Sequence, residues 1–213
     1  MKRITFWVML IAAVTAFATP NANATAVLTL SDGITTQTVT DSDNDGFLLF
    51  NGGIGNWIVN VTTGLTKPLI GSTLAPSMDL NSIDVSSTAG GALTITFKDD
   101  GWASTDHSFF SQIGGTLLSG GSISARSYID QGGSPVDLFN ETFSTSPFTG
   151  SSWTNASISS ADDFLVLETV IHHVGSGATS FDFAVSVPEA SALLLFGTGL
   201  FGLVGYRRVR RMQ

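Results

Sequence analysis

Short runs in which apolar and polar residues alternate recur between residues 26 and 185, and they constrain the fold more than any other feature of the chain. Successive side chains of a β-strand point to opposite faces, so such alternation is typical of strands with one buried face. In 93–97, for example, Leu93, Ile95 and Phe97 share one face and two threonines share the other. This alternation predicts strands over residues 26–30, 34–40, 47–51, 56–62, 82–86, 93–98, 122–129, 153–159, 164–172 and 180–185.

The sequence between these runs is typical of turns, because clusters of Gly, Asp, Asn and Ser separate them. Helical periodicity is almost absent, and no repeat of fixed period indicates a solenoid or propeller. One half-buried face per strand is typical of antiparallel sheets. We therefore expect an all-β fold, a single antiparallel β-sandwich of jelly-roll or immunoglobulin-like kind, over residues 25–186.

The N-terminus has the features of a secretory signal peptide. Lys2 and Arg3 precede an apolar stretch, Ile4–Ala18, and Ala22-Asn23-Ala24 offers a small-residue cleavage site. We expect a signal peptide over residues 1–24, with a retained membrane anchor as the alternative.

The last 27 residues, 187–213, have three parts in a fixed order. A Val-Pro-Glu turn is followed by an uncharged apolar run over 190–206 and then by four arginines. As an α-helix the run is about 25 Å long, near the lower limit for crossing a bilayer. Positive charge resists translocation, so the run predicts a transmembrane helix that ends in a cytoplasmic cluster. The alternative is a buried C-terminal helix of a soluble domain. The predicted stop-transfer residues are Arg207, Arg208, Arg210 and Arg211.

This order of parts resembles the PEP-CTERM sorting signal of Gram-negative bacteria, which has Val-Pro-Glu-Pro, a glycine-containing membrane helix and an arginine cluster. Val187, Pro188 and Glu189 match the motif, and Ala190 stands at its fourth position in place of proline. The resemblance implies recognition by an exosortase, a membrane protease of transpeptidase type, and cleavage near the motif. Residues 55–68 also resemble a stretch of uncharacterised PEP-CTERM proteins, which implies a shared β-domain with no known activity.

The two terminal segments agree on topology, since the first exports the chain and the last halts it with arginines inside. We expect transient anchoring in the inner membrane, followed by a cell-surface or extracellular location. Between the two segments, residues 25–186 hold three basic and 16 acidic side chains, a formal net charge of −13 with His neutral. Such a surface excludes nucleic acid as a partner, which needs a basic footprint. The chain has no cysteine, so disulfides do not stabilise it.

A candidate calcium loop is the run Asp41-Ser42-Asp43-Asn44-Asp45-Gly46. Alternate oxygen ligands followed by glycine begin an EF-hand loop, because Ca²⁺ takes several oxygen ligands. The twelfth position of such a loop is a bidentate Glu, and here it is Gly52. We predict a calcium loop between strands with Asp41, Asp43 and Asp45 as ligands, and an acidic hairpin turn as the alternative.

Several aromatic residues are candidates for a carbohydrate groove, although aromatics more often fill the interior of a sandwich. They are Trp57, Trp102, Trp153 and the Phe-rich runs Phe109-Phe110 and Phe139 to Phe148. Trp102 lies between Asp100 and His107 in a predicted loop, so it is the predicted carbohydrate contact. The histidine pair His172 and His173 is expected to point to opposite faces of a strand, which disfavours a shared metal.

The chain shows no nucleophile elbow, metalloprotease helix or phosphate loop, so we expect a protein that is not an enzyme. Adjacent acidic residues such as Asp99-Asp100 and Asp162-Asp163 are more typical of turns than of glycosidase sites. The leading hypothesis is an exported surface or matrix protein with a structural or adhesive role, associated with exopolysaccharide. The alternatives are a calcium-assisted carbohydrate-binding module and a secreted hydrolase of unrecognised type.

Overall fold

The computed structural model describes residues 25–118 and 120–188, and these residues form β-strands joined by turns and loops. No helix occurs among the described residues. The strands are β1 (Val27–Ser31), β2 (Thr36–Thr40), β3 (Phe47–Ile54), β4 (Trp57–Leu65), β5 (Ser77–Ser87), β6 (Gly91–Asp99), β7 (Asp106–Thr116), β8 (Ser122–Asp130), β9 (Pro135–Phe143), β10 (Phe148–Ser157), β11 (Phe164–His173) and β12 (Gly177–Ser186).

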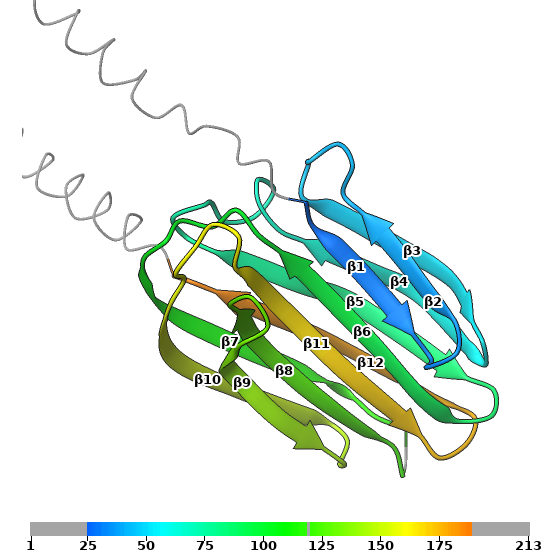
Figure 1. Cartoon of the computed structure of the whole chain (residues 1–213). Helices are drawn as coiled ribbons and strands as arrows, with labels where there is room; N and C mark the ends of the chain where they lie inside the picture. The colour runs from blue at the N-terminus through cyan, green and yellow to red at the C-terminus, as the bar shows by residue number, and fades with distance from the viewer. Residues whose placement is uncertain (1–24, 119, 189–213) are drawn as a thin grey trace, which may run out of the picture.

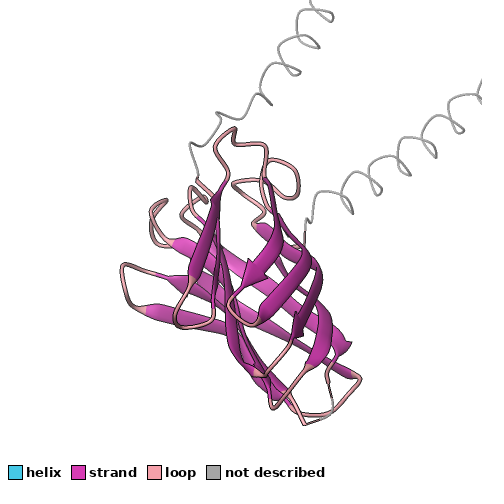
Figure 2. Ribbon diagram, turned by 90° about the vertical axis from the view of Figure 1, so that its right-hand side faces the viewer, coloured by secondary structure: helices cyan, strands magenta, loops and turns pink. Residues whose placement is uncertain are grey.

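The strands form two six-stranded sheets that face each other (Figures 1 and 2). The first sheet has the order β2-β1-β6-β11-β8-β9, and the second has the order β10-β7-β12-β5-β4-β3. Neighbouring strands pair antiparallel throughout both sheets. The predicted all-β antiparallel sandwich is therefore confirmed.

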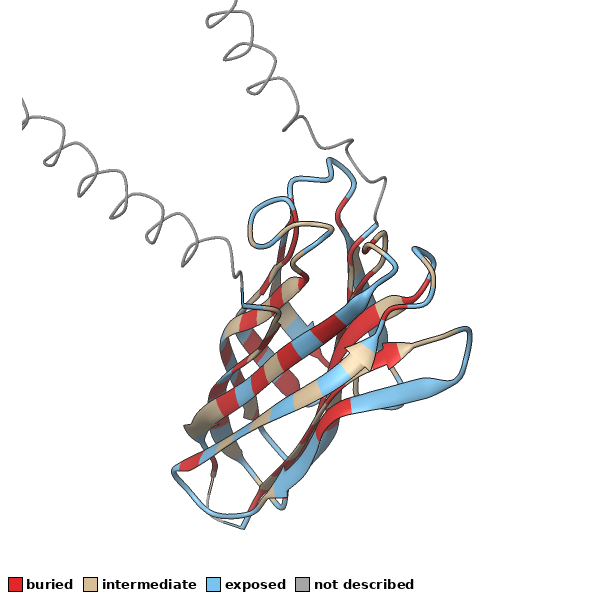
Figure 3. Ribbon diagram, turned by 90° about the vertical axis from the view of Figure 1, so that its left-hand side faces the viewer, coloured by how far each residue is buried: buried red, intermediate tan, exposed pale blue. Residues whose placement is uncertain are grey.

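The core lies between the sheets and is built from the apolar positions of the alternating runs. Leu93, Ile95 and Phe97 of β6 are buried, as are Phe181 and Phe183 of β12, which confirms the predicted inward faces. Figure 3 shows the resulting alternation of buried and exposed residues along the strands. Each large apolar side chain contributes about 1.5 to 3 kcal/mol on full burial, so this core is the main stabilising element of a chain without disulfides.

Two strands, β7 and β9, are absent from the sequence prediction. In β7, Phe109 is buried while its neighbour Phe110 faces outward, so the apolar pair hides the alternation. In β9, a register shift leaves Leu138 unpaired between two matched positions, and both Leu138 and Phe139 are buried. Such a bulge interrupts the period of two on which the prediction depends.

Both ends of the described chain lie at the same end of the sandwich (Figures 1 and 2). The chain stays bonded to the sandwich after β12 ends, because the backbone N–H of Val187 donates to the carbonyl of Pro76 at 2.8 Å. Val187 also packs against the core. The first residue of the predicted sorting motif is therefore part of the folded sandwich.

Candidate functional site

A groove of about 540 Å³ lies on the outer face of the second sheet, across β10, β7, β12 and β5. Its volume is within the range of small-ligand sites. The pleat of β7 turns Phe110, Gln112 and Gly114 outward into the groove while Phe109 is buried. The lining residues are Asp79, Asn81, Phe110, Gln112, Ile113, Gly114, Thr149, Gly150, Ser151, Asp182, Phe183 and Ala184.

One end of the groove carries an exposed aromatic pair. Trp153 of β10 lies directly opposite Phe110 of β7, and the two ring centroids are 4.8 Å apart. Trp153 is 61% exposed. The two rings are inclined by 36°, and Trp153 extends the apolar surface of the groove residue Phe110 toward solvent. Such a surface suits a ring-shaped ligand.

The opposite wall is polar and is shaped by a β-bulge. The pairing of β5 with β12 shifts at Asp182, where Asn81 and Ser82 together face one residue. Ser82 has a φ of 55°, which is uncommon for a residue other than glycine. Its N–H donates to Asp182 Oδ1 at 2.6 Å, and its hydroxyl donates to Asn81 Oδ1 at 2.7 Å. Bulges and strained backbone concentrate at functional sites because they re-aim side chains.

Asp79 brings a second carboxylate into the same groove. Burial raises the pKa of the Asp79 carboxyl; a hydrogen bond from Asn81 opposes this, and the negative charge of Asp182 adds to it. Asp79 and Asp182 thus give the groove two carboxylates that can accept hydrogen bonds from a hydroxyl-bearing ligand. A titratable group perturbed by burial and by a neighbouring charge is a common property of binding sites.

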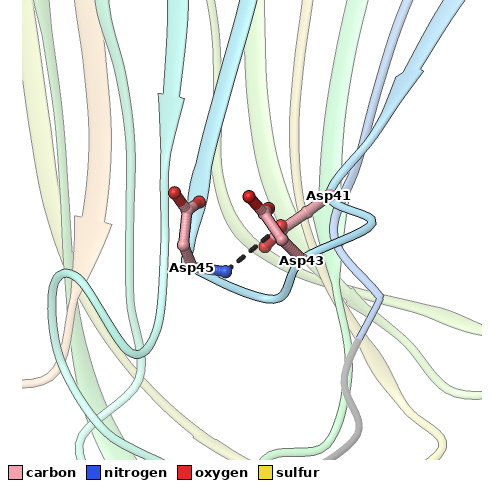
Figure 4. Close-up of side chains that lie close together, drawn as sticks. All are labelled: Asp41, Asp43 and Asp45. Carbon is pink, nitrogen blue, oxygen red and sulfur yellow. Dashed lines mark hydrogen bonds between the residues drawn. The ribbon is translucent and has the colours of Figure 1, made fainter.

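The predicted calcium loop lies between β2 and β3, at the end of the sandwich where the described chain begins. One carboxylate oxygen from each of Asp41, Asp43 and Asp45 lies within 4.8 Å of the others (Figure 4). Asp41 is buried and accepts the N–H of Gly46 at 2.9 Å, and that of Asp45 at 3.3 Å. Asp41 therefore stabilises the turn by itself, while Asp43 and Asp45 are exposed. Calcium binding at this loop stays a prediction.

Trp102 is not a carbohydrate contact in this structure, because it is only 1% exposed. Its Nε1 donates to the carbonyl of Asp99 at 2.9 Å, and the ammonium of Lys67 lies 3.5 Å from its ring centroid. Lys67 is itself buried and forms a 2.8 Å ion pair with Asp99. Trp102 was expected to be accessible because it lies in a loop, but that loop folds back over the end of the core.

The two adjacent histidines do not form a shared site. His172 is exposed whereas His173 is buried and bonded to Ser87 and Thr179 at 2.7 Å each, so the two histidines point to opposite faces, as predicted. Within residues 25–118 and 120–188, the loop of Asp41 is the one group of three or more acidic or histidine side chains close enough for a metal ion.

The adjacent acidic pairs also serve the fold. The Asp99 carboxylate forms an ion pair with Lys67. Asp163 is buried and accepts from the N–H and hydroxyl of Ser159 and from the N–H of Ser160. Burial alone would raise the pKa of Asp163, but these hydrogen bonds outweigh it and lower the pKa. Neither adjacent pair presents two carboxylates to the groove.

Parts of the predicted terminal signals fall outside the described residues. Val187 and Pro188 are described, whereas Glu189, Ala190, the predicted helix over 190–206 and the arginines are not, and neither is the predicted signal peptide. Among the residues that are described, no helix is long and apolar enough to cross a membrane.

Sequence reasoning included Phe110 among the candidate aromatics but missed the polar groove residues. A signal for two of them exists. In Phe181-Asp182-Phe183, alternation places Asp182 on the outer face between two buried aromatics. In the same way, Asp79 lies between the buried residues Met78 and Leu80. No sequence pattern indicates that these outward residues meet across neighbouring strands, because their meeting depends on strand order and on the bulge.

A family model, described as the PEP-CTERM protein-sorting motif, matches residues 186–211. The chain therefore carries this sorting motif, which confirms the resemblance seen in its last residues. Such a motif implies export, membrane-anchored processing by an exosortase and delivery to the surface. A search of curated proteins found no match to the chain.

Among solved structures, the enzymatically active domain of tailspike protein 4 from bacteriophage CBA120 matches with 11% identity and a TM-score of 0.36, covering 64% of this chain and 20% of that one. A CBM4 structure matches with 9% identity and a TM-score of 0.33, and the match covers 70% of this chain and 90% of that one. The mannan-recognising module TmCBM27 matches with 10% identity and a TM-score of 0.27, and the match covers 67% of this chain and 99% of that one. At these TM-scores none of the three carries an argument about this chain.

Proposed function

We propose that this chain is an exported surface or extracellular-matrix protein that an exosortase sorts through its C-terminal signal, and that its β-domain has a structural or adhesive role in association with exopolysaccharide. The observation that carries the proposal is the sorting motif at residues 186–211, which begins where β12 ends at Ser186. The folded domain thus leads directly into the signal that would be removed.

The experiment compares wild-type cells with cells that lack the exosortase. In wild-type cells we expect a protein shortened near residues 187–190 and located at the surface or in the matrix. In exosortase-deficient cells the unprocessed protein should stay in the inner membrane. A variant that lacks residues 190–213 should be released unprocessed into the medium. If size and location are the same in both cell types, the sorting proposal is wrong.

A second candidate function, hydrolysis of a secreted glycan, is favoured by one observation. Asp79 and Asp182 line the same groove, and glycosidases act with two carboxylates. We propose the non-enzymatic role because Asp182 is already held by the N–H of Ser82. If the wild type releases reducing ends from a polysaccharide and both Asp79→Asn and Asp182→Asn lose this activity, the domain is a hydrolase.

A further inference from the structure

We propose that the groove on the outer face of the second sheet binds a polysaccharide chain that carries hydroxyl groups and no acidic substituents. Trp153 and Phe110 would form the stacking wall, and Asp79, Asn81 and Asp182 the polar wall. The inference rests on the proposed adhesive role and gives that role a site and a ligand class.

The stacking wall is suited to a sugar ring. The C–H face of a pyranose is apolar and packs on an aromatic ring, whereas its edges carry hydroxyl groups. Trp153 offers such a ring in an open position, and Phe110 supports it at 4.8 Å. Trp153 is not part of the core, so its indole is free to pack against a ligand.

The polar wall is organised before any ligand binds. The bonds from Ser82 fix the Asp182 carboxylate and the Asn81 amide, and Asp79 lies within 3.5 Å of the Asn81 nitrogen. Pre-organisation lowers the entropic cost of binding. An ionised carboxylate accepts hydrogen bonds and cannot donate them, so it selects donor groups such as sugar hydroxyls.

Two small residues lie on the groove floor beside Gln112. Gly114 and Ala184 lie between the two walls, and neither has a side chain that would block an extended chain. An added Cβ at Gly114 would meet its nearest neighbour at 3.8 Å, an ordinary contact distance. Gly114 can therefore be replaced to fill the groove without straining the backbone.

Charge defines the ligand class. Residues 25–186 have a formal net charge of −13, and the groove itself contains two carboxylates. The three basic residues of this region lie elsewhere: Lys67 pairs with Asp99, Arg126 pairs with Asp137, and Lys98 lies over the Phe164 ring. A polymer of uronic acids would meet like charge with no cation to offset it, so the ligand is an uncharged polysaccharide.

Affinity electrophoresis tests the proposal on the full chain purified in detergent. The gels contain hydroxyethyl cellulose, galactomannan or dextran as uncharged probes, and alginate as the polyuronate. We expect retardation by at least one uncharged polymer and none by alginate. No retardation by any uncharged probe, or stronger retardation by alginate, would overturn the proposal.

Two variants and one matched control locate the binding. Trp153→Ala should weaken binding about tenfold through loss of stacking, and Gly114→Val should abolish it by filling the floor. Ile58→Ala is the control, because Ile58 is exposed on β4 of the same sheet but does not line the groove. It should bind like the wild type. Melting temperatures report whether each variant is folded.

If Trp153→Ala and Gly114→Val bind as the control does, the groove is not the site. If the two substitutions instead change the oligomeric mass of the protein in light scattering, the groove is covered by a second copy and the proposal is wrong. Binding is measured on purified protein and sorting in cells, so a failure of one does not affect the other.

Discussion

Two regions of the sandwich use the same residue types in opposite ways. At one end of the core, Trp102 is buried with Lys67 and Asp99, and each polar atom named there has a partner. On the outer face of the second sheet, Trp153 is open to solvent and packs against Phe110, which lines the groove together with two carboxylates. A tryptophan near acidic residues is therefore not a functional signal by itself. The informative difference is whether the indole is enclosed by the core or open to solvent.

The two tryptophans should differ most in their contribution to stability. Trp102→Ala should lower the free energy of unfolding by about 3 to 5 kcal/mol, because it leaves a large cavity and removes the ring beneath Lys67. Trp153→Ala should cost about 1 kcal/mol or less, the value of one exposed aromatic pair. Urea unfolding of both variants measures the difference. Equal losses would remove the distinction between a core tryptophan and a surface tryptophan.

The buried ion pair gives the next largest effect. Burial lowers the pKa of Lys67 and raises that of Asp99, because the loss of hydration outweighs the attraction between the two charges. Lys67→Met leaves Asp99 buried without its cation and should destabilise the domain by about 3 kcal/mol in urea unfolding.

The double variant Lys67→Met with Asp99→Asn is the control for this substitution. It should recover part of the lost stability, since no unpaired charge remains. A double variant that is less stable than Lys67→Met alone would show that Asp99 stabilises the fold through Thr66 and Asp100 even without Lys67.

The predicted calcium loop combines buried and exposed carboxylates. Asp41 is buried and hydrogen-bonded, whereas Asp43 and Asp45 are exposed. If the loop binds calcium, an ion at ten times its dissociation constant stabilises the fold by about 1.4 kcal/mol and raises the melting temperature by a few degrees. Asp43→Ala with Asp45→Ala should abolish the rise, and magnesium at the same concentration controls for ionic strength. An unchanged wild-type melting temperature would leave the loop as a turn.

The smallest predicted effect concerns the pH dependence of Asp79. The pKa of Asp79 is raised in the folded state above the ordinary value of 3.8. Between these two pKa values the folded protein keeps a proton that the unfolded chain has lost. The carboxyl therefore lowers stability as pH rises from the unfolded value through the folded one. Asp79→Asn should raise the free energy of unfolding at about pH 7 by about 0.5 kcal/mol and leave it unchanged at about pH 3. A gain of equal size at both pH values would rule out ionisation as the cause.

Alternation predicted the fold class because it depends on each strand alone. Leu93, Ile95 and Phe97 are buried wherever β6 lies in the sheet, since the pleat sets their common face. The groove could not be predicted in this way. Phe110 meets Trp153 only because β7 pairs with β10 in one particular register, and Asp182 meets Asn81 only at a bulge. Trp102 fails for a related reason, because a loop position does not reveal that the loop covers the core.

The shared location of the two described chain ends has a practical consequence for labelling. The turn between β1 and β2 lies at the opposite end of the sandwich, and Ile34 in that turn is 94% exposed. Because the chain contains no cysteine, Ile34→Cys would introduce a unique thiol far from the sorting motif, from the groove and from the acidic loop. A fluorophore attached there would report the location of the protein without touching the groove or the residues that lead into the sorting motif.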